Sequence, residues 1–238
     1  MNRPEVLNAL SKRMFQELRK GLEAAKDDKQ IRFITITGKG LSFSAGLDIR
    51  EVGGFKSRSE ARFFVYEQVK PFWEAFFGCE KPVVSMVNGP AYGAGAEIAL
   101  ASDMTIASER STFAFSGGRV GALCCISGVL GPSVLTGRKS VEMNLTGKPV
   151  SAKEAQRIGL VNCSVPEEKL LSTTQALLED MQKVSPISNS SFKRIVRGTI
   201  SNRAFEIAYR ELFNTITSPD FKKGSKAFID KEPPQYYS

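Results

Sequence analysis

Residues 88–101 decide the fold that we expect, and they run Asn88-Gly89-Pro90-Ala91-Tyr92-Gly93-Ala94-Gly95-Ala96-Glu97-Ile98-Ala99-Leu100-Ala101. The apolar run at 82–87 before them predicts a buried strand. The glycines then permit a sharp turn, and residues 94–101 predict a helix of small and apolar residues that one carboxylate, Glu97, interrupts. This order presents free backbone N–H groups at the positive end of a helix dipole. The stretch therefore suits an anion, either a bound phosphate or an oxyanion that forms during a reaction.

A second glycine-bearing loop follows another predicted strand. The β-rich run at 31–37 predicts that strand, and residues 41–49 form the loop after it. Each loop, at 45–48 and at 93–97, can present a backbone N–H group. If both groups met one carbonyl oxygen, they would form a hole for a developing enolate, in which one donor is worth about 3 kcal/mol. Glu97 lies one helical turn into the predicted helix, where it could move a proton. The alternative is that both loops are simple tight turns.

The remaining pattern alternates strands with helices and then becomes wholly helical. We expect a helix at about 9–26, capped by Asn8 or Ser11, and capping boxes begin helices at Ser57 and Ser151. The apolar stripe after Ser57 is typical of core packing. Other strands are expected at 104–107, 112–115 and 160–165, and other helices at 167–183, 188–197, 203–216 and 219–229. This order predicts an α/β core, residues 1–165, and a helical C-terminal region, residues 166–238.

The charge of the chain favours a small polyanion over a nucleic acid. The chain has 238 residues and a formal net charge of +8. Its Lys and Arg residues are scattered along helix-like segments together with acids, which is typical of solvated surfaces. A nucleic-acid-binding protein, which charge alone would favour, is expected to cluster them among aromatic residues. We therefore expect no nucleic-acid partner, and the basic surface would attract an anionic small molecule.

Residue types that are rare or missing exclude several kinds of chemistry. The chain has no histidine, which removes Ser-His-Asp and Cys-His nucleophile schemes and most histidine metal sites. Its four cysteines, Cys79, Cys124, Cys125 and Cys163, show neither metal-ligand spacing nor a disulfide framework. We expect no metal and a reducing, cytoplasmic compartment. The sequence has no signal-peptide pattern and no membrane-spanning run, so we expect no membrane association.

Four ordered motifs, at 2–10, 43–49, 81–97 and 145–161, closely resemble those of the crotonase (enoyl-CoA hydratase/isomerase) family. The resemblance covers essentially the whole chain. It implies a ββα spiral core with C-terminal helices that assemble homotrimers or dimers of trimers. It also implies an acyl-CoA thioester substrate, an enolate-like intermediate and no separate cofactor, since coenzyme A is part of the substrate.

The resemblance assigns roles to the residues that match the family's motifs. Leu47 and Ala94 would supply the two backbone N–H groups of an oxyanion hole, and Glu97 would be the acid/base. The residues expected to bind coenzyme A are Ala45, Asp48 and Ile49 in the first loop, and Phe228 and Lys231 near the C-terminus. Together these roles describe an enzyme of enoyl-CoA hydratase or isomerase type.

Two departures from the family pattern bear on location and mechanism. Family members carry initial strands before the Asn-Arg-Pro motif, which here occupies residues 2–4, and an organellar location is expected if such a segment precedes this chain. Hydratases use a second glutamate, which by alignment falls on Gly117. One carboxylate is enough for a 1,3-proton shift, whereas hydration needs a second group. The alternative function is therefore a protein of the same fold that binds CoA thioesters with little or no hydratase activity.

Two of the candidate residues also have plainer explanations. Glu97 is alternatively a buried acid that pairs with an arginine such as Arg119, because a carboxylate in so apolar a helix needs a partner. Asp48 is alternatively a helix cap.

Overall fold

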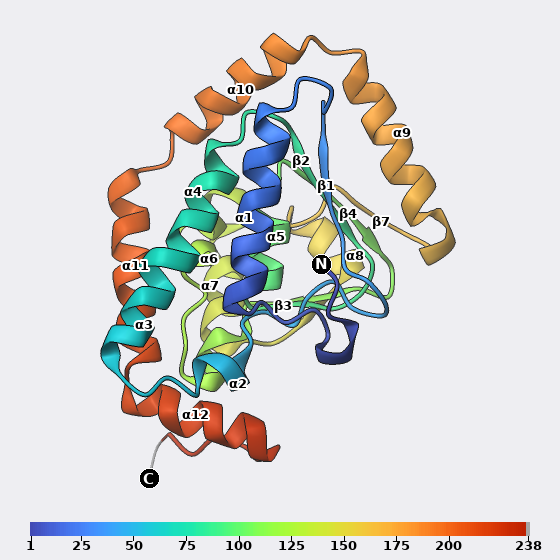
Figure 1. Ribbon diagram of the computed structural model, residues 1–238. Coiled ribbons are helices and arrows are strands. Elements are labelled where there is room, and N and C mark those ends of the chain that lie inside the picture. The colour runs from blue at the N-terminus through green and yellow to red at the C-terminus, as the bar shows by residue number, and fades with distance from the viewer. Residues whose placement is uncertain (237–238) are drawn as a thin grey trace.

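The structure is a computed structural model that describes residues 1–236, and two sheets form its centre (Figure 1). The larger sheet is parallel, in the order β1 (Ile34–Ile36), β2 (Val83–Val87), β4 (Met104–Ser108) and β7 (Cys163–Val165). The smaller sheet has the order β3 (Ala91–Tyr92), β5 (Thr112–Ala114) and β6 (Val150–Ser151). The chain alternates between the two sheets, since β2 leads into β3 and β4 leads into β5.

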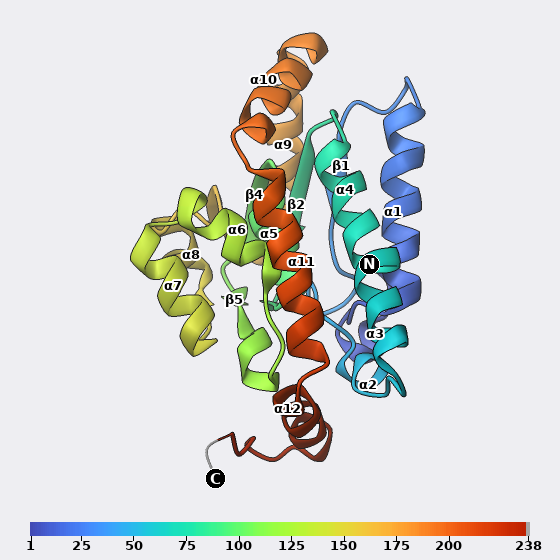
Figure 2. The same ribbon diagram turned by 90° about the vertical axis from the view of Figure 1, so that its left-hand side faces the viewer.

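Three helices with a shared aromatic core lie beside the larger sheet. They are α1 (Lys12–Asp27), α3 (Arg58–Phe64) and α4 (Lys70–Gly78), and a π-helical segment, Val65–Val69, joins the last two. Figure 2 shows α1 and α4 side by side. The predicted stripe after Ser57 is buried as expected, and its members are Ala61, Phe64, Val65, Val69, Phe72, Trp73 and Phe76. The large rings of this stripe pack edge-on against each other and against Phe15 of α1.

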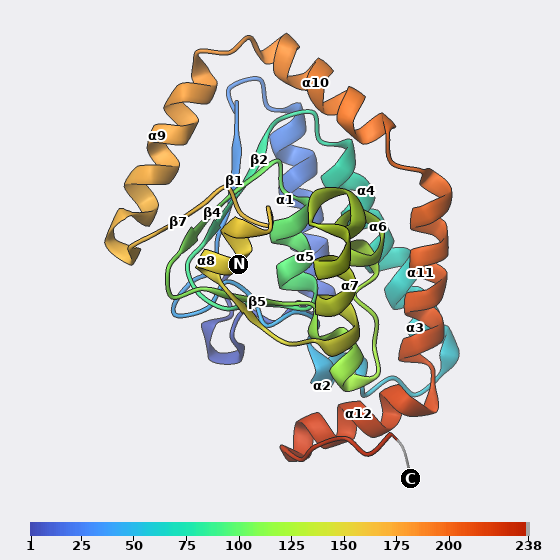
Figure 3. The ribbon, with the colours of Figure 1, turned by 180° about the vertical axis from the view of Figure 1, so that it is seen from behind.

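The helix predicted from the opening stretch lies in the middle of the molecule. Helix α5 (Ala94–Ala101) has the predicted bounds, and all of its residues are buried. Helix α6 (Cys125–Val134) packs on α5, and α7 (Gly137–Thr146) packs on α6 (Figure 3). The short helices α2 (Ile49–Val52) and α8 (Ala152–Arg157) are capped by Asp48 and Ser151.

The described part of the chain is helical after β7. The four long helices there are α9 (Leu170–Gln182), α10 (Pro186–Gly198), α11 (Asn202–Ile216) and α12 (Pro219–Asp230). They form an arc around the core in Figure 1, in which α12 reaches the end of the molecule that holds α2. The predicted fold class, an α/β spiral core with a helical C-terminal region, is therefore confirmed. The division into domains at residues 165 and 166 stays a prediction.

Several element boundaries differ from the sequence-based expectation. Helix α1 begins at Lys12 and not at residue 9, because Ser11 is its cap and Asn8 has a left-handed backbone with φ +56°. The strand expected at 31–37 is confined to β1. Helices α6 and α7 were not expected from the sequence. Helix α6 is rich in glycine and serine and has Pro132 inside it, which disfavours a helix.

Strand β1 forms one edge of the larger sheet. An open groove of about 890 Å³ borders it and is lined mainly by residues of α1 and β1. The Met1 ammonium donates to Thr37 O at 2.7 Å, just beyond the end of β1. Within residues 1–236, no helix combines the length and apolar character that crossing a bilayer requires.

Candidate active site

The two glycine loops, which lie far apart in the sequence, are in direct backbone contact. Tyr92 N donates to Ser44 O at 2.9 Å, and Ser44 N donates to Pro90 O at 3.2 Å. A Cβ atom built on Gly46 would lie 2.7 Å from Tyr92 O and 3.2 Å from Ala94 N. Gly46 also has φ +90°, which side-chain-bearing residues rarely adopt. Only glycine fits at this point, and the loops converge as a two-donor hole requires.

The backbone around Leu47 turns its N–H group away from the N-terminal segment. Leu10 N donates to Gly46 O at 2.7 Å, and Asp48 N donates to Leu10 O at 3.1 Å. In this parallel pairing the residues on either side of Leu47 face Leu10, so the amide of Leu47 itself points to the opposite side. Gly46, the residue before it, lies against Tyr92 and Ala94, and Leu47 N has no hydrogen-bond acceptor among residues 1–236.

The second candidate donor begins helix α5. Ala94 N is the first N–H group of that helix and has no intrahelical acceptor, as geometry requires of a first turn. Gly93, with φ +52°, makes the turn that aims this end of the helix at Gly46. Within the described chain Ala94 N has no other acceptor either. Two amides without an acceptor, one from each loop, therefore lie on either side of the contact at Gly46, and that of Ala94 is at the positive end of a helix dipole.

Glu97 lies one turn further along α5, and its carboxylate is held by another helix. Only 3% of Glu97 is exposed. Its Oε1 accepts hydrogen bonds from Ile126 N at 2.7 Å and from Ser127 N at 2.9 Å, in the first turn of α6. Oε2 has no hydrogen-bond partner in the described part of the chain, which leaves one carboxylate oxygen for a ligand. The structure thus places Ala94 and Glu97 one helical turn apart on α5, with Gly46, the residue before Leu47, against Ala94. The roles of Leu47, Ala94 and Glu97 stay predictions.

Burial changes the acidity of this group. Desolvation raises the pKa of the Glu97 carboxyl to about 8, and the hydrogen bonds from Ser127 N and Ile126 N lower it only in part. A carboxyl group with a pKa near the operating pH is suited to both accepting and donating a proton.

Backbone N–H groups, and not an arginine, hold the Glu97 carboxylate. The proposed ion pair with Arg119 is wrong, because Arg119 Nε donates to Thr146 O at 3.0 Å and the partners of Glu97 are backbone groups. Gly117, the position expected for a second glutamate, faces a thiol. A Cβ atom built on Gly117 would lie 3.1 Å from Cys124 Sγ, and Gly117 N already donates to that sulfur.

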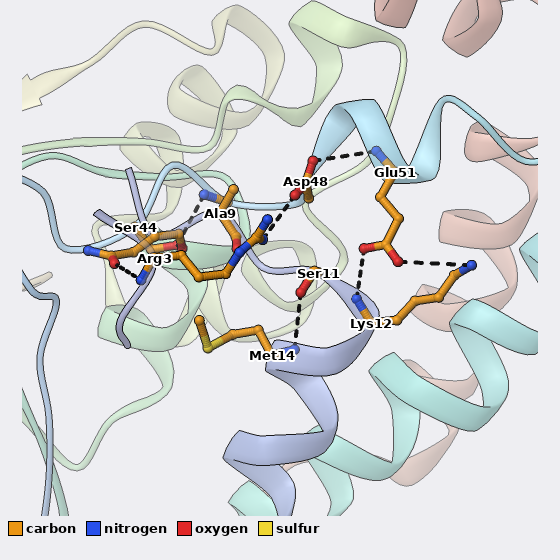
Figure 4. Close-up of polar contacts among 10 residues, drawn as sticks. Arg3, Ala9, Ser11, Lys12, Met14, Ser44, Asp48 and Glu51 are labelled. Carbon is orange, nitrogen blue, oxygen red and sulfur yellow. Dashed lines mark hydrogen bonds and ion pairs between the residues drawn. The ribbon is translucent and has the colours of Figure 1, made fainter. Parts of the chain in front are cut away.

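The residues predicted to bind coenzyme A lie at the outer end of the first loop and on α12. Ala45 is exposed, and Ile49 is partly buried at the start of α2. Asp48 caps α2, in agreement with the alternative that it is a helix cap. It also accepts a hydrogen bond from Arg3 Nη1 at 2.9 Å (Figure 4). Phe228 and Lys231 are exposed on and just after α12, which packs on α2. The role of these five residues in binding coenzyme A stays a prediction.

The groups that hold the site in place were not predicted from the sequence. The amides of Ile126 and Ser127 belong to a helix that the sequence did not predict, and backbone donors leave no mark on residue identity. Asn8, expected as a cap and included in the motif at 2–10, is wholly buried and donates to Ser42 O in the first loop. Its neighbour Arg3 was part of a recognised motif, but the motif did not reveal its partner Asp48.

Comparison with known proteins agrees with this architecture. The structure superposes on an enoyl-CoA hydratase/isomerase from Pseudoalteromonas atlantica with a TM-score of 0.87 and 29% identity, covering 100% of this chain and 94% of that one. A carnitinyl-CoA hydratase from Mycobacterium avium gives a TM-score of 0.84 and 29% identity, covering 99% and 92%. The fold is therefore that of the crotonases.

Sequence comparison then identifies the family. A family model described as enoyl-CoA hydratase/isomerase matches residues 1–238, so the chain belongs to this family of enzymes. The chain is 31% identical to a probable enoyl-CoA hydratase of Mycobacterium tuberculosis, covering 99% of this chain and 92% of that protein. It is 30% identical to the mitochondrial enoyl-CoA hydratase domain-containing protein 3 of Xenopus laevis, covering 98% and 80%.

The raised pKa of Glu97 predicts how stability depends on pH. The folded state, with a pKa of about 8 against an ordinary value of 4.5, binds more protons than the unfolded state between these pH values. The free energy of unfolding should therefore fall as pH rises from about 5 to 8. Glu97→Gln, which mimics the protonated acid, should escape this loss. One pKa unit is worth about 1.4 kcal/mol, so urea unfolding should favour the variant by a few kcal/mol at pH 8. An advantage that stays constant from pH 5 to 8 would contradict the burial argument.

Proposed function

We propose that this enzyme stabilises the enolate of an acyl-CoA thioester between Leu47 N–H and Ala94 N–H, with Glu97 as the group that moves the proton. The observation that carries the proposal is the backbone contact at Gly46, which turns two free amides toward one region a single helical turn from a buried carboxyl. Backbone donors of this kind are fixed in advance, so they stabilise developing charge without reorganisation.

The chemistry best suited to this set of groups is a 1,3-proton shift. With a β,γ-unsaturated acyl-CoA, Glu97 Oε2 takes a proton from the α-carbon, and the electron pair of that C–H bond moves toward the thioester oxygen, which becomes an enolate. The two amides bind this oxyanion. The protonated Glu97 then gives the proton to the γ-carbon, the double bond moves to the α,β position, and the carboxylate is restored. No second acid enters this cycle.

The position of Gly117 supports proton transfer over hydration. Addition of water needs one group that activates the water and another that handles the α-proton. Gly117 carries no side chain, and the nearest atoms to its Cβ position belong to Leu123 and Cys124. The environment that would hold a second carboxylate is therefore filled by a neutral thiol.

The coenzyme A moiety is proposed to lie along α2 and the neighbouring part of α12. Ala45, Asp48 and Ile49 line the start of α2, and the packing of α12 on α2 supports a shared surface with Phe228 and Lys231. Coenzyme A enters as part of the substrate, and we propose no separate cofactor. A cytoplasmic or organellar compartment stays a prediction.

A second candidate function follows from the same observation. With no acid at position 117, the protein is alternatively a binder of CoA thioesters with little or no hydratase activity. The two functions make different demands on Glu97, because binding alone requires no proton transfer.

We also propose that the chain assembles into a homotrimer or a dimer of trimers. Support comes from large apolar side chains that the single chain leaves exposed on α10, namely Ile187, Phe192 and Ile195. Apolar side chains gathered in this way are typical of surfaces that bind another protein.

The function is tested by turnover on a panel of 2-enoyl and 3-enoyl CoA thioesters of several chain lengths. We expect the wild-type protein to isomerise 3-enoyl thioesters faster than it hydrates 2-enoyl thioesters. Glu97→Gln should lower turnover by about 100- to 10,000-fold, the usual contribution of a general acid/base. Glu17→Gln, an exposed position on α1, is the matched control. Unchanged turnover in Glu97→Gln would remove Glu97 from the mechanism, and binding without any turnover by the wild type would favour the second candidate.

The hole is tested at the glycine that lets the loops meet. Gly46→Ala places a methyl group against Tyr92 O and Ala94 N, so the loops must separate. We expect kcat to fall by about 100-fold or more, as when one oxyanion donor is lost. Gly159→Ala is the control, because Gly159 has a similar φ of +85° but ends α8 near Val134 O. Equal losses in the two variants would mean that backbone strain, and not the hole, causes the effect.

The assembly is tested by sedimentation. The wild type should have the mass of three or six chains of 26.1 kDa. Ile195→Glu places a charge on the apolar surface of α10 and should shift the mass toward a single chain. Leu41→Glu changes an equally exposed leucine in a loop and should leave the mass unaltered. A wild-type protein that sediments as one chain would contradict the proposed assembly.

A further inference from the structure

The loop that carries Leu47 is built against the N-terminal segment of the chain. Ala45 N donates to Leu7 O at 2.9 Å, and the pairing of Leu10 with Gly46 and Asp48 continues this contact on the far side of the glycine. The position of Leu47 N is thus set by residues 7–10 on one side and by the turn at Gly93 on the other. A displacement of residues 7–10 would carry the Leu47 amide with it.

Asn8 fixes the shape of that N-terminal segment. Its side chain is wholly buried, Oδ1 accepts from Arg3 N at 2.9 Å, and Nδ2 donates to Ser42 O at 2.8 Å and to Lys39 O at 3.0 Å. Both Nδ2 hydrogens are used. Asn8 also has φ +56°, a conformation that asparagine tolerates better than most residues. This position therefore demands an amide and a left-handed backbone together.

A short relay of hydrogen bonds leads from Asn8 to the hole. Ser44 Oγ donates to Asn8 O at 2.9 Å and accepts from Gly46 N at 3.2 Å. Ser44 is itself wholly buried, so water does not replace these bonds. The relay ends at the residue before Leu47, and it fixes the peptide that precedes the candidate oxyanion donor.

An ion pair braces the other side of Leu47. Arg3 Nη1 donates to Asp48 Oδ2 at 2.9 Å and to Ala9 O at 2.8 Å, as Figure 4 shows. The pair is partly exposed, so its contribution is smaller than that of the buried relay. Ser44 thus fixes Gly46, the residue before Leu47, and Arg3 fixes Asp48, the residue after it.

We propose that Asn8 and Ser44 are positioning residues for the oxyanion hole: they hold the Leu47 N–H at the place where, with Ala94 N–H, it meets a thioester oxygen. This inference rests on the proposed function. Asn8 acts through the backbone of the first loop, and Ser44 does so too while it also packs against Gly95 in the first turn of α5. A misplacement of about 1 Å in such a donor costs about 100-fold in rate.

A purely structural role for Asn8 would have a different signature. Loss of its hydrogen bonds would then lower stability, and the fraction that stays folded would keep its kcat and its polarisation of the thioester. Asn88 offers a matched comparison, because its amide also binds loop backbone, accepting from Gly38 N at 3.1 Å and donating to Gly40 O at 2.8 Å. Its bonds brace residues 38–40 and not the Leu47 loop.

The experiment compares Asn8→Gly, Ser44→Ala and Asn88→Gly in the full-length chain. Glycine keeps the left-handed backbone of Asn8 available while it removes the amide. Four quantities are measured: the melting temperature, kcat and KM on the best thioester of the panel, and the absorption shift of a bound conjugated enoyl-CoA, which reports polarisation of its carbonyl. We expect Asn8→Gly and Ser44→Ala to lose about 10- to 100-fold in kcat, to change KM little and to give a smaller absorption shift. Asn88→Gly should lower the melting temperature but keep kcat and the shift.

The outcomes separate this inference from the proposed function. If the wild type polarises the thioester and the Asn8 and Ser44 variants do so equally well, the positioning role is overturned while the hole stands. If all three variants lose kcat together, the effect is general loop stability, and the positioning role is also overturned. If the wild type itself neither polarises nor turns over any thioester, the proposed hole fails and the inference fails with it. Should Asn8→Gly not fold, Ser44→Ala decides, because it removes one oxygen and leaves the packing of the loop intact.

Discussion

The structure depends on one close approach of backbone to backbone, at Gly46. Here the loop after β1 passes so near the turn between β3 and α5 that not even a methyl group fits between them. The parallel bridge from Ser44 to Ala91 on one side and the pairing with Leu10 on the other hold the loop at this place. A sheet edge, a helix N-terminus and the N-terminal segment are therefore all tied to a residue without a side chain. Peptide groups rather than side chains make the contact, and backbone hydrogen bonds to Pro90, Tyr92 and Leu10 hold the loop in place.

The buried carboxyl of Glu97 is the second constraint, and the first turn of α6 lies against it. A carboxylate inside an apolar core is costly unless hydrogen bonds compensate for lost water. The first turn of α6 offers two unpaired N–H groups with a favourable dipole, and Glu97 Oε1 takes both. Hydrogen bonds to a charged group are worth about 1.5 to 3 kcal/mol each. The compensation is incomplete, since the pKa of Glu97 still rises to about 8. A fully compensated carboxylate would be a poor proton acceptor, so incomplete compensation is what proton transfer requires.

Periodicity and capping patterns predicted the helices and strands whose sequences carry a clear local signal. The bounds of α5, the buried β2 and the caps at Ser57 and Ser151 followed from periodicity and capping patterns. The family followed from ordered motifs along the whole chain. Helix α6 was missed because its sequence, rich in glycine and serine, has low helix propensity, and contact with α5 and α11 stabilises it instead. Helix α7, which was also missed, packs on α6. The partners of Glu97 were missed for a different reason. An arginine partner can be sought in a sequence, whereas a backbone amide leaves no mark on residue identity.

The candidate site combines fixed donors with a single group that changes protonation. During a proton shift the same acid must first be a base and then an acid, so its two states need similar free energies. With a pKa near 8 they differ by about 1.4 kcal/mol at pH 7. The hydrogen bonds at Oε1 keep that oxygen fixed, which leaves Oε2 as the oxygen that carries the proton. Cys124 occupies the space beside Gly117, and burial holds the pKa of its thiol well above the usual value, so it stays neutral and does not compete for the proton. Under the proposed function, one proton carrier with two fixed amides and no carboxylate at position 117 suits movement of a double bond better than addition of water.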